Sequence, residues 1–273
     1  MKLSVSNIAW GKENFLDFLK LLKEEGCEGV ELAPSLIWDE PILSSNKERL
    51  ILKKQISDSG LKLVGFHSLL FSRPDLQLFK NEISRRNTII YLKELIKLCS
   101  ELDGTQLVFG SPNNRLLHGK KYEDCLSQSY DDFLNIAEYC FKNRVYFCIE
   151  PLGKNLSEFI VSMNEGGDLV RKINHPNFRL HLDTKTVFTT KEDMSMFVEN
   201  YGDLIQHVHV SDDDLNEPGS VNKNEEHINL SQYLKKIKYE NFLSIEMKKN
   251  GINALKRGIK FVKSTYISAD ETF

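Results

Sequence analysis

The sequence predicts a closed (β/α)8 barrel, and three observations support this fold class. Short apolar segments typical of buried strands alternate with amphipathic helical segments at intervals of roughly 25–40 residues, which favours a parallel sheet with crossover helices. Eight such units within 273 residues match the size of a barrel of about 250 residues. No linker or low-complexity segment divides the chain, so residues 1–273 are predicted to form one domain.

The predicted strands are short runs rich in Val, Ile, Leu and Phe that are bounded by Gly, Pro or polar residues. Gly29 begins one of them, and Gly104 separates another from the helix before it. The predicted strands cover residues 3–8, 29–32, 61–70, 106–109, 145–151, 178–183, 205–210 and 242–246.

The predicted helices carry apolar residues spaced three and four apart, as Phe15, Phe18 and Leu22 are in the first of them. Gly26 and Gly60 end the first two helices, because glycine is typical just past a helix C-terminus. The predicted helices cover residues 14–25, 46–59, 80–102, 123–142, 156–173, 191–200, 230–237 and 252–264.

An open, doubly wound sheet is the rival fold. Its dinucleotide-binding version carries Gly-x-Gly-x-x-Gly after the first strand, and no such motif follows residues 3–8. The barrel is therefore the preferred interpretation.

Composition limits the partners of the protein. Net charge is −3, and the basic residues are dispersed, so no nucleic-acid partner is expected. No apolar run approaches the roughly 18 residues that span a bilayer, so no membrane partner is expected. The five cysteines are scattered without a Cys-x-x-Cys pair, and the N-terminus is not typical of a signal peptide. These features predict a reduced, cytoplasmic setting, and they are compatible with a homo-oligomer.

Four polar side chains stand at the ends of predicted strands. Glu150, Asp183 and Glu246 end three strands, and His209 lies near the end of a fourth. Strand ends converge on one face of a barrel, where carboxylates repel one another unless a cation lies among them. Each acid alone could instead cap a helix or pair with a lysine. The four together favour a divalent ion, and oxygen-rich ligands suit Mn²⁺, Mg²⁺ or Co²⁺ better than Zn²⁺.

Residues 206–212 alternate polar and apolar side chains with the period of a strand. His207 and His209 therefore point to the same face. A buried histidine is more commonly a hydrogen-bonded core residue than a metal ligand. We therefore expect His207, and His181 two residues before Asp183, to be core groups or supports for the ligands.

Four motifs together resemble the ligand motifs of the xylose isomerase-like TIM barrels, the sugar isomerase and epimerase group. They are Ile149-Glu150-Pro151, Leu182-Asp183-Thr184, His207-Val208-His209-Val210-Ser211-Asp212 and Ser244-Ile245-Glu246. The resemblance covers the chain from Ser6 to about Lys260. It implies a (β/α)8 barrel and one divalent metal ion, which would be held by Glu150, Asp183, His209 and Glu246.

The resemblance also implies proton transfer beside the carbonyl of a sugar substrate. A ketose would bind the ion through its oxygens, and the ion would stabilise the developing enediolate. Glu150 and Glu246 are the expected catalytic acid and base. Proton return to the opposite face of the same carbon gives epimerisation, and return to the neighbouring carbon gives isomerisation. The expected substrate-binding residues are His67, Lys185, Thr186 and Asp212.

Three positions depart from the family pattern. Leu156 stands where many members carry a second carboxylate, and Thr186 stands where many carry a histidine. Residues 212–217 are acidic where many carry an arginine, and this charge disfavours a phosphorylated sugar. Lys154 and Lys248 are cations that could reach the same region.

These departures leave two alternatives to the isomerase. One is a metal-dependent dehydratase acting on a keto-polyol or keto acid, because elimination also begins from an enolate. The other is a non-catalytic sugar-binding barrel. Endonuclease IV-like DNA repair is disfavoured, because Thr186 replaces a histidine of that zinc cluster and a basic surface is absent.

Overall fold

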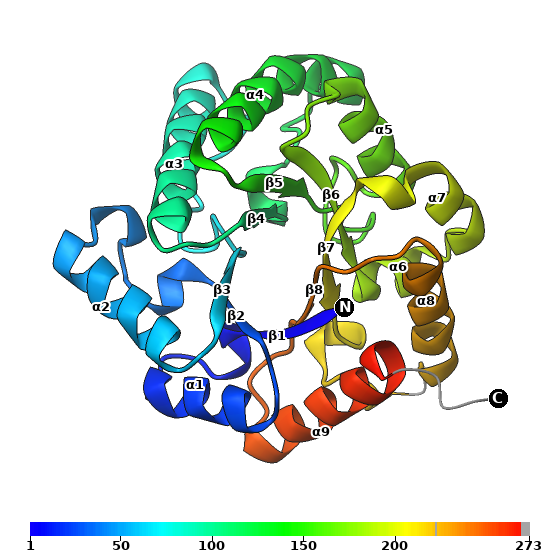
Figure 1. Cartoon of the computed structure of the whole chain (residues 1–273). Helices are drawn as coiled ribbons and strands as arrows, with labels where there is room; N and C mark the ends of the chain where they lie inside the picture. The colour runs from blue at the N-terminus through cyan, green and yellow to red at the C-terminus, as the bar shows by residue number, and fades with distance from the viewer. Residues whose placement is uncertain (222, 269–273) are drawn as a thin grey trace.

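The strands close into a parallel barrel in the order β1 to β8, with β8 paired to β1 (Figure 1). The predicted fold class is thereby confirmed. The computed structural model describes residues 1–221 and 223–268. The strands are β1 (Lys2–Ser6), β2 (Gly29–Leu32), β3 (Lys62–Phe66), β4 (Gln106–Phe109), β5 (Tyr146–Ile149), β6 (Phe178–Asp183), β7 (Ile205–Val210) and β8 (Phe242–Ile245).

Helices surround the barrel and cover the outer face of its strands (Figure 1). In the described part of the chain these are α1 (Phe15–Glu24), α2 (Asn46–Asp58), α3 (Glu82–Glu101), α4 (Tyr122–Asn143), α5 (Met163–Ile173), α6 (Thr184–Thr190), α7 (Met194–Tyr201), α8 (Asn224–Lys236) and α9 (Ile252–Val262). Local capping sets their ends: Ser45 and Glu48 form a reciprocal capping box at the start of α2. Among residues 1–221 and 223–268, no helix has the length and apolar character needed to cross a membrane.

The segment after β5 differs from the sequence prediction. A helix over 156–173 is predicted, whereas α5 begins at Met163. Ser162 caps this helix, because its hydroxyl accepts a hydrogen bond from the Glu165 N–H at 3.1 Å. Ile160 has a φ of 54°, a left-handed conformation that a right-handed helix cannot contain. Residues 156–162 therefore form a loop at the C-terminal end of the barrel.

Two helices, rather than one, connect β6 to β7. The short helix α6 was not predicted, and it begins directly after β6, where Asp183 accepts a hydrogen bond from the Lys185 N–H at 2.9 Å. The predicted helix at 191–200 corresponds to α7. Helix α8 begins at Asn224, whereas the sequence predicts a helix over 230–237. Strand β3 ends at Phe66, whereas the predicted strand extends over 61–70. Capping and turn contacts set these ends, and hydrophobic periodicity does not report them.

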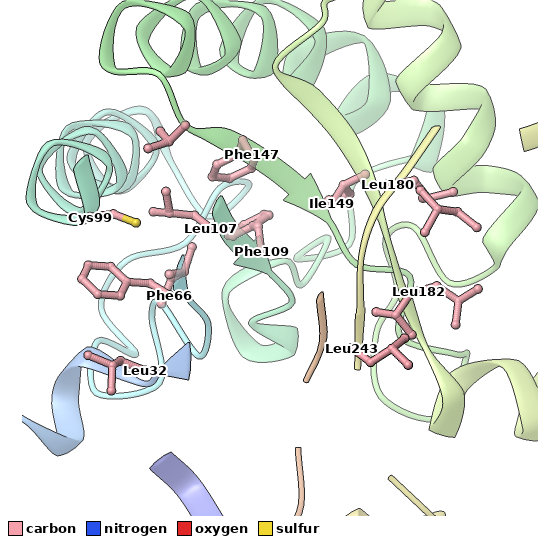
Figure 2. Close-up of a cluster of buried hydrophobic side chains, with 14 of the residues drawn as sticks. Leu32, Phe66, Cys99, Leu107, Phe109, Phe147, Ile149, Leu180, Leu182 and Leu243 are labelled. Atoms are coloured by element: carbon pink, nitrogen blue, oxygen red, sulfur yellow. The ribbon is translucent and has the colours of Figure 1, made fainter. Parts of the chain in front are cut away.

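The main core lies between the barrel and the surrounding helices. Phe133 of α4 packs on Phe178 with ring centroids 5.3 Å apart, and Phe109 packs on Phe147 at 5.4 Å. Figure 2 shows Phe109 and Phe147 among the outward-facing side chains of the strands. Each such buried aromatic residue stabilises the fold by roughly 1.5–3 kcal/mol. Because alternate side chains of a strand face opposite ways, this outer layer leaves the polar residues of the same strands inside the barrel.

Gly65 allows β3 and β4 to approach closely, and its substitution tests this packing. A Cβ atom there would lie 2.0 Å from the carbonyl oxygen of Gln106, which is backbone and cannot move aside cheaply. We expect Gly65→Ala to lower the free energy of unfolding by about 2–4 kcal/mol in urea titration. Gly119→Ala is the control, since a Cβ there meets nothing within 4 Å and only its φ of 75° opposes alanine. That variant should lose about 1 kcal/mol; equal losses in the two variants would contradict the argument.

Candidate active site

The four predicted ligands lie at the C-terminal end of the barrel. Glu150 follows β5, Asp183 ends β6, His209 lies in β7 and Glu246 follows β8. All four are buried, with exposed fractions from 0% for Asp183 to 9% for Glu246. Asp183 and His209 are also register partners on neighbouring strands. The parallel topology therefore gathers these residues at one end, as their positions in the sequence predict.

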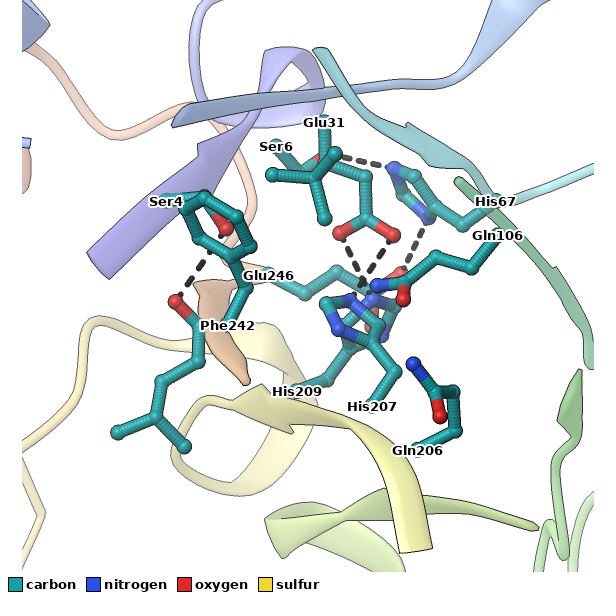
Figure 3. Close-up of polar contacts among 12 residues, drawn as sticks. Ser4, Ser6, Glu31, His67, Gln106, Gln206, His207, His209, Phe242 and Glu246 are labelled. Atoms are coloured by element: carbon teal, nitrogen blue, oxygen red, sulfur yellow. Dashed lines mark hydrogen bonds and ion pairs between the residues drawn. The ribbon is translucent and has the colours of Figure 1, made fainter. Parts of the chain in front are cut away.

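Glu246 is paired with two histidines. Its Oε1 lies 3.0 Å from His67 Nδ1, and its Oε2 lies 3.3 Å from His209 Nδ1. His67 Nε2 in turn contacts the Ser6 hydroxyl at 2.5 Å (Figure 3). Burial opposes the charge of Glu246, but His209 and His67 together hold its pKa well below the usual value. Glu246 is therefore ionised and fixed in position.

Glu150 has a different environment. Burial raises its pKa to about 8, and the charges of Asp183 and Glu246 add to that rise. Asp183 faces Lys185, whose Nζ lies 3.4 Å from Asp183 Oδ2, and this oxygen accepts no hydrogen bond. Burial opposes the charge of Lys185, but Asp183, Glu246 and Glu150 raise its pKa. Mutual repulsion of buried carboxylates, and a carboxylate oxygen whose contact is a single ion pair without a hydrogen bond, are features that a divalent cation would relieve.

The structure brings some predicted ligands closer together than others. Single ligand atoms of His67, His209 and Glu246 lie within 4.8 Å of one another. Glu150 and Asp183 do not belong to that group, although the charges of Asp183 and Glu246 both act on Glu150. The four-ligand assignment therefore stays a prediction, and His67 lies beside Glu246 and His209.

Glu31 of β2 is a site residue that the sequence analysis missed. Its carboxylate is fully buried, with Oε2 2.9 Å from His209 Nε2 and Oε1 3.1 Å from His207 Nε2 (Figure 3). Burial opposes its charge, but His207 and His209 lower its pKa well below the usual value. A carboxylate in the middle of the otherwise apolar strand Gly29–Leu32 was the available signal.

A cleft of about 840 Å³ lies between the loop after β5, helix α6 and the loop after β7, and none of the four predicted ligands lines it. Lys185 and Thr186 line it, as do Leu156 and Lys154. The Thr186 hydroxyl is buried and has no hydrogen-bond partner. Two of the predicted substrate-binding residues, Lys185 and Thr186, thus face a cavity of the size that small ligands occupy.

Asp212, also predicted to bind substrate, uses both carboxylate oxygens in hydrogen bonds within the protein. Its Oδ2 accepts hydrogen bonds from the Ser220 and Val221 N–H groups, both at 2.8 Å. Its Oδ1 lies 2.8 Å from His227 Nε2, and His227 Nδ1 contacts the Tyr266 hydroxyl at 2.6 Å. Both oxygens of Asp212 therefore hold the loop after β7 against α8 and the C-terminal segment.

Arg115 and Lys248 contact groups next to the site. Arg115 is fully buried and donates a hydrogen bond from Nη2 to the Glu150 carbonyl oxygen at 2.9 Å. Lys248 forms an ion pair with Asp214, one of the residues that line the cleft, at 2.8 Å. Part of the acidic charge after β7 is therefore neutralised.

Comparison with known proteins places the chain in a family. The family model for the xylose isomerase-like TIM barrel matches residues 19–265. The chain therefore belongs to this family, as its ligand motifs indicated. No curated protein matches its sequence.

Solved structures share the whole fold. The apo form of 3-keto-D-glucoside 4-epimerase YcjR from E. coli has a TM-score of 0.80 at 16% identity, covering 97% of this chain and 98% of that one. D-Psicose 3-epimerase from Clostridium cellulolyticum H10, solved with D-tagatose, has a TM-score of 0.78 at 18% identity, covering 99% and 93%. An AP endonuclease of family 2 from Brucella melitensis has a TM-score of 0.75 at 18% identity, covering 97% and 100%. At these identities the likeness establishes the fold alone.

Asp212→Asn tests whether Asp212 stabilises the fold. The carboxylate keeps a lowered pKa, because the bonds from His227 and Val221 outweigh the effect of burial. Its stabilisation is therefore present above the unfolded-state pKa and is lost as pH falls through the folded-state value. We expect the variant to lose about 1–3 kcal/mol of unfolding free energy at pH 7, and the difference from the parent to shrink in acid. Asp214→Asn, at an exposed position, should change urea unfolding little; an unchanged Asp212→Asn midpoint would contradict this role.

Proposed function

We propose that the protein is a divalent-metal-dependent sugar epimerase or isomerase. The proposal depends mainly on one observation, the gathering of Glu150, Asp183, His209 and Glu246 at one end of the barrel in a buried setting. Membership of the xylose isomerase-like family supports it. Likeness to a 3-keto-D-glucoside 4-epimerase and to a D-psicose 3-epimerase favours the same class of reaction.

Glu150, Asp183, His209 and Glu246 would hold the metal ion. The set is rich in oxygen, which suits Mn²⁺, Mg²⁺ or Co²⁺. When bound, the ion would polarise the carbonyl group of the substrate. Asp183 Oδ2, which accepts no hydrogen bond, and the crowding of three carboxylates support a cation at this position.

Glu150 and Glu246 would exchange the proton with the substrate. They follow β5 and β8, which are not neighbours in the barrel, so they face the enclosed space from different sides of the rim. Epimerisation needs one group that removes a proton from one face of a carbon and another that returns it to the opposite face. The placement of the two carboxylates therefore favours epimerisation over aldose–ketose isomerisation.

The cleft that Lys185 and Thr186 line would hold the sugar. Lys185 would offer its ammonium group, and Thr186 carries a buried hydroxyl without a hydrogen-bond partner. Asp213 also lines the cleft, and its charge disfavours a phosphate group. His67 contacts Glu246 and Ser6 through its two ring nitrogens, so it would fix the orientation of Glu246. Any contact of His67 with the substrate would be made by the edge of its ring. We propose an uncharged ketose as the substrate.

Solvent deuterium exchange tests the acid–base pair. Free and phosphorylated ketoses would be incubated in D₂O with the metal-loaded protein, and exchange would be followed by NMR. We expect Glu150→Gln and Glu246→Gln each to slow exchange on the order of 100-fold or more, because each removes one proton-transfer group. Thermal unfolding of each variant would show whether it is folded.

His118→Asn is the control for this experiment, because His118 is exposed and far in sequence from the four ligands. Parent-like exchange in both glutamine variants would refute the assignment. A product that lacks one molecule of water relative to the substrate would indicate the dehydratase instead. Sugar binding without exchange, and unaffected by a chelator, would indicate a non-catalytic barrel.

Gly110 tests the position of Glu150. A Cβ atom at Gly110 would lie 2.1 Å from Glu150 Oε2, so alanine must displace the carboxylate. Because a side-chain end can move, we expect Gly110→Ala to fold normally and yet lower kcat on the order of 10- to 100-fold. Steady-state kinetics with the best substrate of the exchange screen, alongside thermal unfolding, would check this. A parent-like kcat would show that the position of Glu150 does not limit the reaction.

A further inference from the structure

A second group of polar side chains lies inside the barrel, on the far side of His209 from Glu246. Glu31 of β2, His181 of β6 and His207 of β7 are all fully buried, each with an exposed fraction of 0%. His181 and His207 are register partners across β6 and β7. Figure 3 shows Glu31 pointing toward His207 and His209. The proposed function gives no task to His181, His207 or Glu31.

The three histidines are close enough to share one ion. Their ring centroids are 5.4 Å apart for His181 and His207, 4.2 Å for His181 and His209, and 5.1 Å for His207 and His209. One ring nitrogen from each lies within 4.8 Å of the others. Glu31 lies on the same cluster, 3.1 Å from His207 Nε2 and 2.9 Å from His209 Nε2.

Several of these polar atoms have no partner. Both ring nitrogens of His181 and Nδ1 of His207 make no hydrogen bond, and His207 Nε2 contacts only Glu31 Oε1, at 3.1 Å. Burial of an unpaired polar group has a cost in stability, and native proteins rarely contain several such groups together. An ion that accepts lone pairs from several of these atoms at once would remove most of that cost.

His209 faces both groups. Its Nδ1 lies 3.3 Å from Glu246 Oε2, on the side of the proposed catalytic ion, and its Nε2 lies 2.9 Å from Glu31 Oε2. The two ring nitrogens of His209 can therefore serve two centres, provided that the ring releases its N–H proton to solvent when both ions bind and becomes a bridging imidazolate. We call the proposed catalytic centre at Glu246 the upper site and the centre at Glu31, His181 and His207 the lower site. The upper site is rich in carboxylates, whereas the lower site is rich in imidazoles.

We propose that Glu31, His181, His207 and the inner nitrogen of His209 form a second metal site, structural in role, for a Zn²⁺-like ion. Three imidazoles and one carboxylate provide the four ligands of a tetrahedral Zn²⁺ site. Imidazole suits Zn²⁺ and Co²⁺ better than Mg²⁺. The ion would link β2, β6 and β7 and would hold His209 in the orientation that the upper site needs. Because every ligand is buried, the ion enters during folding and leaves slowly.

Metal content tests the second site without any measurement of activity. The full chain would be produced in medium containing Co²⁺, and bound metal would be counted by mass spectrometry. Visible absorption would report tetrahedral Co²⁺. We expect two ions per chain in the parent, one of which resists a chelator until the protein is unfolded. His181→Asn and His207→Asn should each lose the chelator-resistant ion and the tetrahedral absorption.

Controls separate this site from the proposed catalytic one. Asp183→Asn should lose the chelator-sensitive ion and keep the tetrahedral absorption, and His118→Asn should keep both ions. Glu31→Gln, which keeps the shape of the side chain, should weaken retention of the resistant ion even if the histidine variants fold poorly. A parent chain with no chelator-resistant ion, or tetrahedral absorption unchanged in His181→Asn and His207→Asn, would overturn the second site. Loss of the resistant ion alone in those variants, with no metal lost in Asp183→Asn, would support the second site and reject the upper one.

Discussion

Compensation of buried negative charge is the constraint on which the rest of the site depends. Glu31 and Glu246 each contact two histidines, and Asp183 faces Lys185. Among the described residues, Glu150 has no ion-pair partner of its own, and burial together with Asp183 and Glu246 raises its pKa to about 8. The chain therefore places a positively charged or histidine partner in contact with three of these carboxylates, whereas Lys185 and His209 act on Glu150 without an ion-pair contact. The cation of the proposed function would add positive charge at this position.

Barrel closure creates this situation by placing strand ends together. β2, β5, β6, β7 and β8 are spread over most of the sequence, but all are parallel, so their C-terminal ends lie on one face. The register then arranges the polar residues in two layers, with Asp183 beside His209 at the rim and His181 beside His207 beneath. Both layers are buried, and the layer of His181 and His207 lies two residues deeper in the barrel along the same strands.

The cleft lies among loops and helix α6, outside the closed sheet of the barrel. The cleft is formed by the loop after β5, by helix α6 and by the loop after β7, and none of these is part of the closed sheet. Leu156 and Thr186, two positions that depart from the family pattern, both line it. Proteins that share this barrel fold at 14–20% identity can therefore differ in these loops and still keep the barrel.

The sequence by itself determined the barrel, because hydrophobic periodicity and unit length report local structure directly, and it placed Glu150, Asp183, His209 and Glu246 at strand ends. It did not reveal Glu31, since nothing local shows that a carboxylate on β2 meets histidines on β7. It placed Asp212 with the substrate, whereas the structure directs both of its oxygens to Ser220, Val221 and His227. Which polar atoms meet depends on register and on loop paths between distant segments, and only the folded chain fixes these.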